Sequence, residues 1–146
     1  MPRCSAAWRT AGGGSTTLPI ASLYATAAVR LRLVEVGVFN TTTNQTVSVS
    51  LRRLITSTGT RGAAITSVFQ DDPESVIQGT PYNTHTSAPG IVAGALRTAT
   101  LAATNGVIWT FQEPGLLIAS AVTNAIAVIP WTGTGRVCDV SFTWIE

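Results

Sequence analysis

The sequence has no lysine, one histidine, two cysteines and only seven carboxylates among its 146 residues. General acid-base catalysis and nucleophilic catalysis both need titratable side chains whose pKa can be tuned near the working pH. Because this chain has so few of them, we expect that it is not an enzyme and that it works through shape and contact.

Two further features are missing, a long apolar run and a basic stripe. No run of about 18 apolar residues occurs, which argues against a membrane-spanning helix. The first residues lack the apolar core of a signal peptide, so we expect no secretion and a reducing cytosol in which Cys4 and Cys138 stay as thiols. The net charge is only +2 and the nine arginines are scattered, whereas nucleic-acid binding calls for clustered basic residues with aromatic neighbours. We therefore expect neither a membrane nor a nucleic acid as a partner.

The low charge of the chain also bears on its surface. Charged residues make up 11% of the sequence, against about 25% in typical soluble proteins. A chain of this length fits one domain with its own core. Either the surface is unusually apolar or other subunits cover much of it.

What the chain does contain is a succession of short apolar runs rich in Val, Ile and Thr. The clearest is residues 29–39, where Val29, Leu31 and Leu33 share one face and the apolar set then shifts to Val34 and every second residue after it. This shift predicts a β-bulge near Leu33. Residues 40–45 form a polar turn, and residues 46–55 alternate again, so we expect a hairpin between these two strands.

Six more runs predict strands, at residues 63–69, 91–103, 106–111, 116–120, 125–131 and 136–145. In the last of them one face consists of Cys138, Val140, Phe142 and Trp144. About eight short strands at even spacing predict an all-β fold, an antiparallel β-sandwich of jelly-roll type. We assign residues 20–146 to this single β-sandwich domain.

The remaining segments lack strand periodicity. Residues 1–19 are small, polar and glycine-rich, and we expect an extended N-terminal arm. Asp72 can cap a short helical turn that has Pro73 and Glu74 in its first positions. Residues 80–90 predict a long surface loop in which His85 is solvated.

No motif in the chain predicts a cofactor or a metal. The acidic cluster of Asp71, Asp72 and Glu74 lacks the spacing of a calcium loop, and helix capping explains it better. The segments GGGSTT and TGTGR lack the lysine that a phosphate-binding loop of the Walker type requires. We expect no catalytic, cofactor-binding or metal-binding residue.

The tryptophans divide into two groups. Trp109 and Trp144 fall within strand patterns and are expected in the core. Trp8, beside Arg9 in the predicted arm, is expected to contact a neighbouring subunit, and Trp131 fits either a protein contact or a sugar-stacking position. The candidate partner-binding residues are Arg3, Trp8, Arg9, Leu18 and Trp131.

Four segments resemble small β-sandwich virion proteins of tailed bacteriophages, which decorate the head or belong to the tail tip. They are RLVEVGVFNTTTNQTVSVSLRRL, GVIWTF, GLLIAS and GTGRVCDVSFTWIE, and the resemblance covers about residues 29–146. It implies a non-enzymatic structural protein of the virion, assembled in the cytoplasm of a bacterial host. Such decoration proteins are homo-oligomers, often trimers, that bind the major capsid protein of the same particle. The motifs are structural, and they transfer no catalytic or metal-binding residue.

Two hypotheses follow for the function. In the first, the chain is a capsid decoration or cement protein that binds the head lattice as an oligomer and stabilises it. In the alternative, it is a receptor- or carbohydrate-binding module of a tail tip or fibre. Its site would then contain Trp131, Tyr82 and His85, with Asp71 and Asp72 as ligands for a bridging ion.

Overall fold

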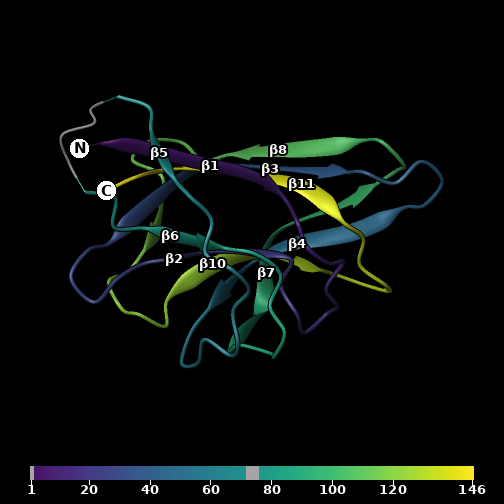
Figure 1. Ribbon diagram of the computed structural model, residues 1–146, viewed down its shortest axis with the longest axis horizontal. Helices are drawn as coiled ribbons and strands as arrows, with labels where there is room; N and C mark the ends of the chain where they lie inside the picture. Colours follow the sequence, from purple (N-terminus) through teal and green to yellow (C-terminus); the bar gives the residue numbers. More distant parts are fainter. Residues whose placement is uncertain (1, 72–75) are drawn as a thin grey trace.

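The computed structural model describes residues 2–71 and 76–146, and it shows an all-β molecule. One six-stranded and one five-stranded antiparallel sheet pack face to face as a sandwich (Figure 1). No helix occurs among the described residues. The β-sandwich predicted from the alternating pattern is therefore confirmed. The predicted helix start at Asp72, Pro73 and Glu74 lies outside the described residues.

The first sheet, called sheet 1, has the strand order β5-β1-β11-β3-β8. The short strand β9 pairs with the first residues of β3, along the same edge of β3 as β8. Its strands are β1 (Arg3–Arg9), β3 (Leu31–Asn40), β5 (Val68–Phe69), β8 (Gly106–Thr110), β9 (Leu116–Ile118) and β11 (Cys138–Ile145). The second sheet, called sheet 2, has the order β6-β2-β10-β4-β7. Its strands are β2 (Ala21–Tyr24), β4 (Val47–Leu54), β6 (Thr80–Tyr82), β7 (Ile91–Leu101) and β10 (Ala125–Pro130).

The irregularity predicted near Leu33 is confirmed in β3. Leu31 and Leu33 are fully buried, and so are Val36 and Val38. The pairing between β3 and β11 skips Val34, which leaves one extra residue on β3. The bulge lets both apolar sets face the core, although they differ in phase along the sequence.

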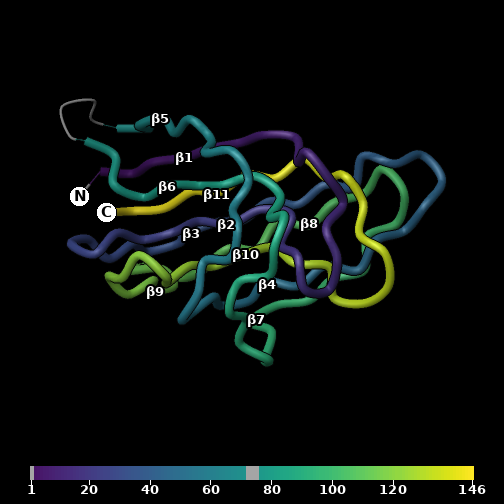
Figure 2. Tube along the Cα trace, turned by 60° about the horizontal axis from the view of Figure 1, so that its bottom comes forward, coloured from purple at the N-terminus to yellow at the C-terminus, as the bar shows by residue number. Residues whose placement is uncertain are grey.

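The hairpin predicted for residues 29–55 is wrong, because β3 lies in sheet 1 and β4 lies in sheet 2. An alternating pattern shows which side chains are buried, but it does not show which strand supplies the hydrogen bonds. The connection instead crosses between the sheets, and Asn40 fixes it. Its Nδ2 donates to the carbonyl of Gln45 at 2.7 Å and to those of Leu101 and Ala102 at 3.3 Å. One side chain therefore joins the β3–β4 and β7–β8 connections at the end of the sandwich opposite the chain termini (Figure 2).

The extended arm predicted for residues 1–19 is also corrected by the structure. Arg3–Arg9 forms β1, which lies inside sheet 1 between β5 and β11. Cys4 and Ala6 are buried, and the Trp8 ring lies 5.8 Å from the ring of Phe142. Alternate residues of β1 therefore face the core. This alternation is not visible in the sequence, because the residues between them are also small.

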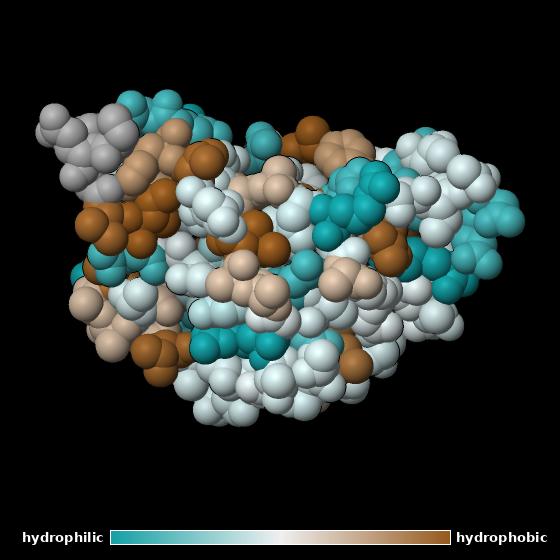
Figure 3. Space-filling view, in the orientation of Figure 1, coloured by the Kyte–Doolittle hydropathy of each residue, from teal (hydrophilic) through white to brown (hydrophobic). Residues whose placement is uncertain are grey.

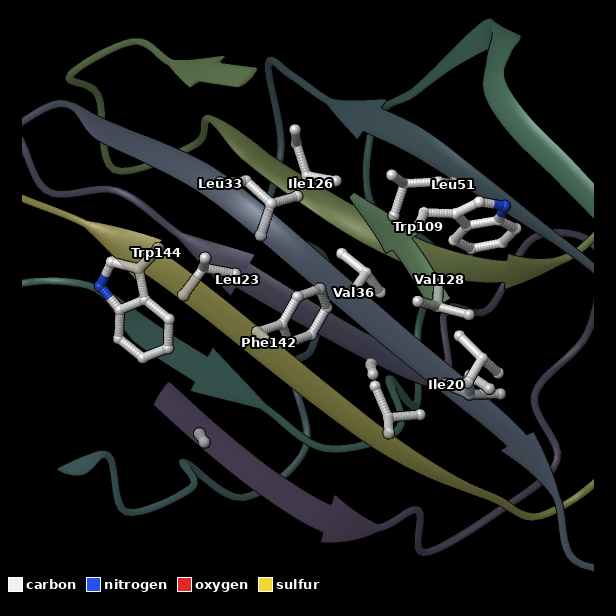
Figure 4. Packing of buried hydrophobic residues seen from close by; sticks show 14 of the residues in the cluster. Ile20, Leu23, Leu33, Val36, Leu51, Trp109, Ile126, Val128, Phe142 and Trp144 are labelled. Carbon is white, nitrogen blue, oxygen red and sulfur yellow. The ribbon is translucent and has the colours of Figure 1, made fainter. Parts of the chain in front are cut away.

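The core between the sheets consists of aliphatic and aromatic side chains from both layers (Figure 4). Phe142 and Trp144 are fully buried and Trp109 is 8% exposed, which confirms the predicted core positions of both tryptophans. All four inward residues of β11 are buried, as predicted. Burying a large apolar side chain contributes about 1.5–3 kcal/mol, so this interface supplies much of the driving force for folding.

Glu146 closes one end of the sandwich. Its carboxylate accepts hydrogen bonds from the backbone N–H of Gln78 at 2.9 Å, from that of Gly79 at 2.7 Å and from the Trp144 indole N–H at 3.0 Å. Three donors therefore converge on one carboxylate and connect the segment before β6 to the end of β11.

Candidate functional site

The two outer faces of the sandwich differ in how they are covered. On sheet 2, Tyr24, Ala127 and Ile129 form a second apolar cluster outside the main core and are at most 1% exposed. Segments 55–67 and 83–90 lie over them and hydrogen-bond to each other. On sheet 1, Phe39 and Ile108 are 41% and 55% exposed. We call the outer surface of sheet 1 the open face, because no segment among residues 2–71 and 76–146 covers these positions.

Cross-strand pairing arranges the open face in rows that run across β1, β11, β3 and β8. The first row is Arg9, Asp139, Phe39 and Gly106; the second is Ala7, Ser141, Gly37 and Ile108; the third is Ser5, Thr143, Glu35 and Thr110. Three of these twelve residues are charged, and most of the others are small or hydroxylated. The open face is therefore poor in charge, and its second row consists of small residues apart from Ile108. Figure 3 shows the molecule from the side, where strongly hydrophilic residues lie in separate groups.

A hollow of about 400 Å³ lies on the open face. It is lined by Ala7, Trp8, Arg9, Phe39, Asp139, Val140 and Ser141. The Phe39 ring packs against Gly106, where a side chain would collide with it, and its Cε2 would lie 3.2 Å from a Cβ at Gly37. The two glycines thus let the ring lie close to the sheet while 41% of the residue remains exposed.

A paired arginine and carboxylate border the hollow. Arg9 Nε donates to Asp139 Oδ1 at 2.8 Å, and Arg9 Nη2 donates to Asp139 Oδ2 at 3.0 Å. This hydrogen bonding lowers the pKa of Asp139 and raises that of Arg9, so the pair stays ionised near neutral pH. Both side chains are largely solvent-exposed, so the pair contributes little to stability. Its planar geometry instead fixes polar groups beside the aromatic ring.

His85 is buried, and the prediction of a solvated loop histidine is wrong. It is 2% exposed, its Nε2 lies 3.0 Å from Ser22 Oγ, and its ring stacks on Tyr24 with a centroid distance of 6.1 Å. Burial, together with the Arg61 cation, lowers the pKa of His85 to about 4. The Nδ1 atom has no partner among the described residues. No carboxylate of the described residues hydrogen-bonds to His85 and the ring is buried, so the Ser22–His85 pair differs from the serine–histidine–aspartate arrangement of hydrolases.

Arg61 stabilises the cover over sheet 2. Its guanidinium lies 4.2 Å from the ring centroid of Tyr82 and 4.9 Å from that of Tyr24. Burial raises the pKa of Tyr24 to about 12. Tyr82 and His85, which the carbohydrate hypothesis placed at a loop-end site, are thus parts of this cover. The same hypothesis made Asp71 and Asp72 ligands of a bridging ion. Asp71 is exposed and accepts a hydrogen bond from the backbone N–H of Arg3 at 3.3 Å. Asp72 lies outside the described residues.

The predicted partner-binding residues occupy different parts of the molecule. Arg3, Trp8 and Arg9 share β1, but Trp8 packs against the core whereas Arg3 pairs with Glu113 at 3.2 Å. Leu18 closes a tight turn through two backbone hydrogen bonds with Ser15. Of the five, only Arg9 and Trp8 line the hollow.

Trp131, the fifth candidate, follows β10 in sheet 2 and is 39% exposed. The guanidinium of Arg52 lies 5.5 Å from its ring centroid. The same guanidinium donates to the carbonyls of Val92 and Ala93. Trp131 is thus an exposed aromatic residue away from the open face.

Phe39, Asp139 and Ser141 are not among the residues predicted from the sequence. Their exposure could be predicted, because each lies next to a buried residue in a strand in which buried and exposed side chains alternate. What the sequence did not show was that β3 and β11 are adjacent, which brings these residues together.

Both cysteines are buried and free, and burial raises the pKa of each thiol to about 11. In the part of the chain that the structure describes, no three histidine, cysteine or acidic side chains gather into a metal site. That part also contains no helix of the length and apolarity needed to span a bilayer. Comparison with protein-family models, curated proteins and solved structures finds no significant match.

Proposed function

We propose that this chain is a non-enzymatic structural protein of a tailed-phage virion, a decoration or cement protein that binds the head lattice as an oligomer and stabilises it. The observation behind the proposal is the unequal covering of the two outer faces. The chain buries the outside of β2 and β10 in sheet 2 under its own loops and leaves the open face of sheet 1 exposed, with Phe39 and Ile108 on it.

The chemistry of the open face supports a protein partner. The cores of protein interfaces are depleted of charge and enriched in aromatic residues. In the three central rows Arg9 and Asp139 already neutralise each other, which leaves Glu35 as the remaining charge. A second copy in a homotrimer and the major capsid protein of the particle are the proposed partners.

The connectivity supports a jelly roll as the finer description of the fold. Leaving out the short strands β5, β6 and β9, the order is β1-β11-β3-β8 in one sheet and β2-β10-β4-β7 in the other. This interleaving of two four-stranded sheets is typical of jelly rolls, which occur in viral capsid proteins and in lectins. Because fold alone does not fix function, the strand order is compatible with both hypotheses.

The test of the leading proposal uses two matched exposed residues. Ile108 is 55% exposed on the open face, and Val122 is 58% exposed in the loop before β10. Ile108→Asp should weaken binding to heads assembled without the chain by about tenfold or more, because a charge is desolvated at the contact. Val122→Asp should bind as the unmodified chain does, and both variants should keep the circular dichroism of a folded sheet protein.

The readouts are co-sedimentation with purified heads and immunogold labelling of complete particles. Label on the heads supports the proposal. Label confined to tails, or full head binding by Ile108→Asp, contradicts it.

The second candidate function is carbohydrate binding at a tail tip or fibre, and the hollow on the open face favours it. An exposed Phe39 ring beside the fixed Arg9–Asp139 pair and the Ser141 hydroxyl offers a stacking surface with hydrogen-bonding groups. Glycan-array binding that Phe39→Ala abolishes and Trp131→Ala retains would favour this function, since the two aromatic residues are 41% and 39% exposed. Binding that Trp131→Ala abolishes and Phe39→Ala retains would place the sugar site at Trp131. The absence of binding to any glycan would exclude carbohydrate binding as the function.

A further inference from the structure

β7 is a long edge strand that the molecule leaves unprotected. It ends sheet 2 on one side, and within the described parts of the chain no strand pairs with its outer edge. It is eleven residues long and contains a single charged residue, Arg97, and no proline. On its other side sheet 2 ends in β6, which has three residues. Natural proteins protect sheet edges with short strands, charges or prolines, and β7 has little of this protection.

Only the second half of β7 is regular enough to accept another strand. Residues 97–101 pair with residues 47–51 in unbroken register, whereas the register shifts twice before them. In the first half, the Arg52 guanidinium donates to the carbonyl of Val92 at 2.8 and 3.0 Å and to that of Ala93 at 3.0 Å. The bulged half of β7 is therefore held by Arg52 of β4, and the free edge is residues 97–101.

The direction of the backbone groups follows from the neighbouring strands. The Trp131 N–H donates to the carbonyl of Ser48 at 2.8 Å, so Ser48 directs its backbone groups toward β10. Directions alternate along a strand, so Val49 directs its groups toward β7, where it pairs with Ala99. The residues on either side of Ala99, Thr98 and Thr100, therefore direct their N–H and C=O groups away from β4, toward the free edge.

We propose that a second copy of this chain pairs with that edge, antiparallel and centred on Ala99. Thr98 of one copy then exchanges both backbone hydrogen bonds with Thr100 of the other, and the small Ala99 side chains face each other. Two five-stranded sheets become one continuous sheet across a two-fold axis. This contact goes beyond the proposed function, because it uses the edge of sheet 2 and leaves the open face of sheet 1 free.

The charge pattern favours a second copy as the occupant. In this register Arg97 lies opposite Leu101 of the other copy, so no like charges face each other. The two Arg97 residues are four positions apart along the paired strands, roughly 13 Å. That separation exceeds the screening length of about 8 Å at physiological salt. Arg97 is also turned back toward its own chain, since its guanidinium lies 5.3 Å from the Phe111 ring centroid.

Analytical ultracentrifugation and amide hydrogen exchange on the whole chain test the proposal together. The mass is measured in the Ile108→Asp background, in which the proposed contact between copies at the open face is blocked, and there we expect the mass of a dimer at high concentration. The Thr98 variants carry the same Ile108→Asp substitution. The Thr98 and Thr100 amides should become protected as the dimer forms, whereas the Ala99 amide should be protected at every concentration. Thr98→Pro removes an outward N–H without touching the ladder to β4, and it should be monomeric. Thr98→Val keeps the N–H and the branched shape, and it should dimerise like the unmodified chain.

Thr98→Lys provides a second blocking variant if the proline variant does not fold, because a lysine on an edge strand opposes pairing. A monomeric mass at all concentrations would overturn the proposal. So would a dimer that persists in the folded Thr98→Pro or Thr98→Lys variant, or one in which the Thr98 and Thr100 amides exchange freely. Ile108→Asp disrupts the open face and should leave the β7 dimer intact. Failure of the open-face contact can therefore be distinguished from failure of the β7 contact.

Discussion

Mild acid should destabilise this protein through a single residue, His85. It is the only histidine of the chain, and it is 2% exposed among Ser22, Tyr24 and the Arg61 cation. Between about pH 7 and about pH 5 few other side chains titrate, because the ordinary pKa values of carboxyl groups and thiols lie outside this range. The pH dependence of stability in this range therefore reports on one buried ring.

The sign and size of the effect follow from the two pKa values of His85. In the folded chain its pKa is about 4, against an ordinary value of 6.5. The unfolded chain therefore takes up the proton first, and stability is lost as the pH falls from the ordinary value toward the folded one. One pKa unit corresponds to about 1.4 kcal/mol, so the loss is about 2 kcal/mol at pH 5 and about 3 kcal/mol for the full shift.

Urea unfolding followed by tryptophan fluorescence measures this loss. With a slope of about 2 kcal/mol per molar urea, the midpoint should fall by about 1 M between pH 7 and pH 5. His85→Gln retains a hydrogen-bonding group for Ser22 and does not titrate, so its midpoint should be nearly constant over the same range. An unchanged midpoint for the unmodified chain, or an equal fall in His85→Gln, would show that His85 does not cause the acid sensitivity.

Three other features of the fold give further predictions. Glu146→Ala should cost about 1–3 kcal/mol in urea unfolding, because two backbone N–H groups and an indole N–H lose their shared acceptor. Asn40→Ala should cost about 1–2 kcal/mol and speed amide hydrogen exchange in both connections that this side chain joins, since three carbonyls lose a donor. Cys4 and Cys138 are both 0% exposed with a pKa of about 11, so a thiol reagent at neutral pH should modify them only at the rate of unfolding, and rapid labelling of the folded chain would contradict their burial.

The parts of the fold that the sequence predicted are those in which one strand's own alternation decides the outcome. The phase shift after Leu33 predicted the bulge in β3, because a strand can keep one face buried only by inserting a residue. The alternation around Phe142 likewise predicted the buried face of β11. Both are local consequences of burial, and neither depends on which strand is the neighbour.

The parts that the sequence did not predict depend on partners distant in the chain. The inward face of β1 consists of small residues and Trp8, and its pairing with β11 and β5 makes it a strand. The burial of His85 depends on the separate segment that contains Arg61. The candidate site has the same origin, since Phe39 and Asp139 are one hundred positions apart in the sequence and directly opposite in the sheet.

The unequal lengths of the edge strands of sheet 2 also limit how far an assembly can grow. A copy that joins at β7 brings only the three-residue β6 at its far side, which is too short to template another strand. Addition at β7 therefore ends after one step and gives a closed pair, whereas two long free edges would allow the open-ended stacking of a fibre.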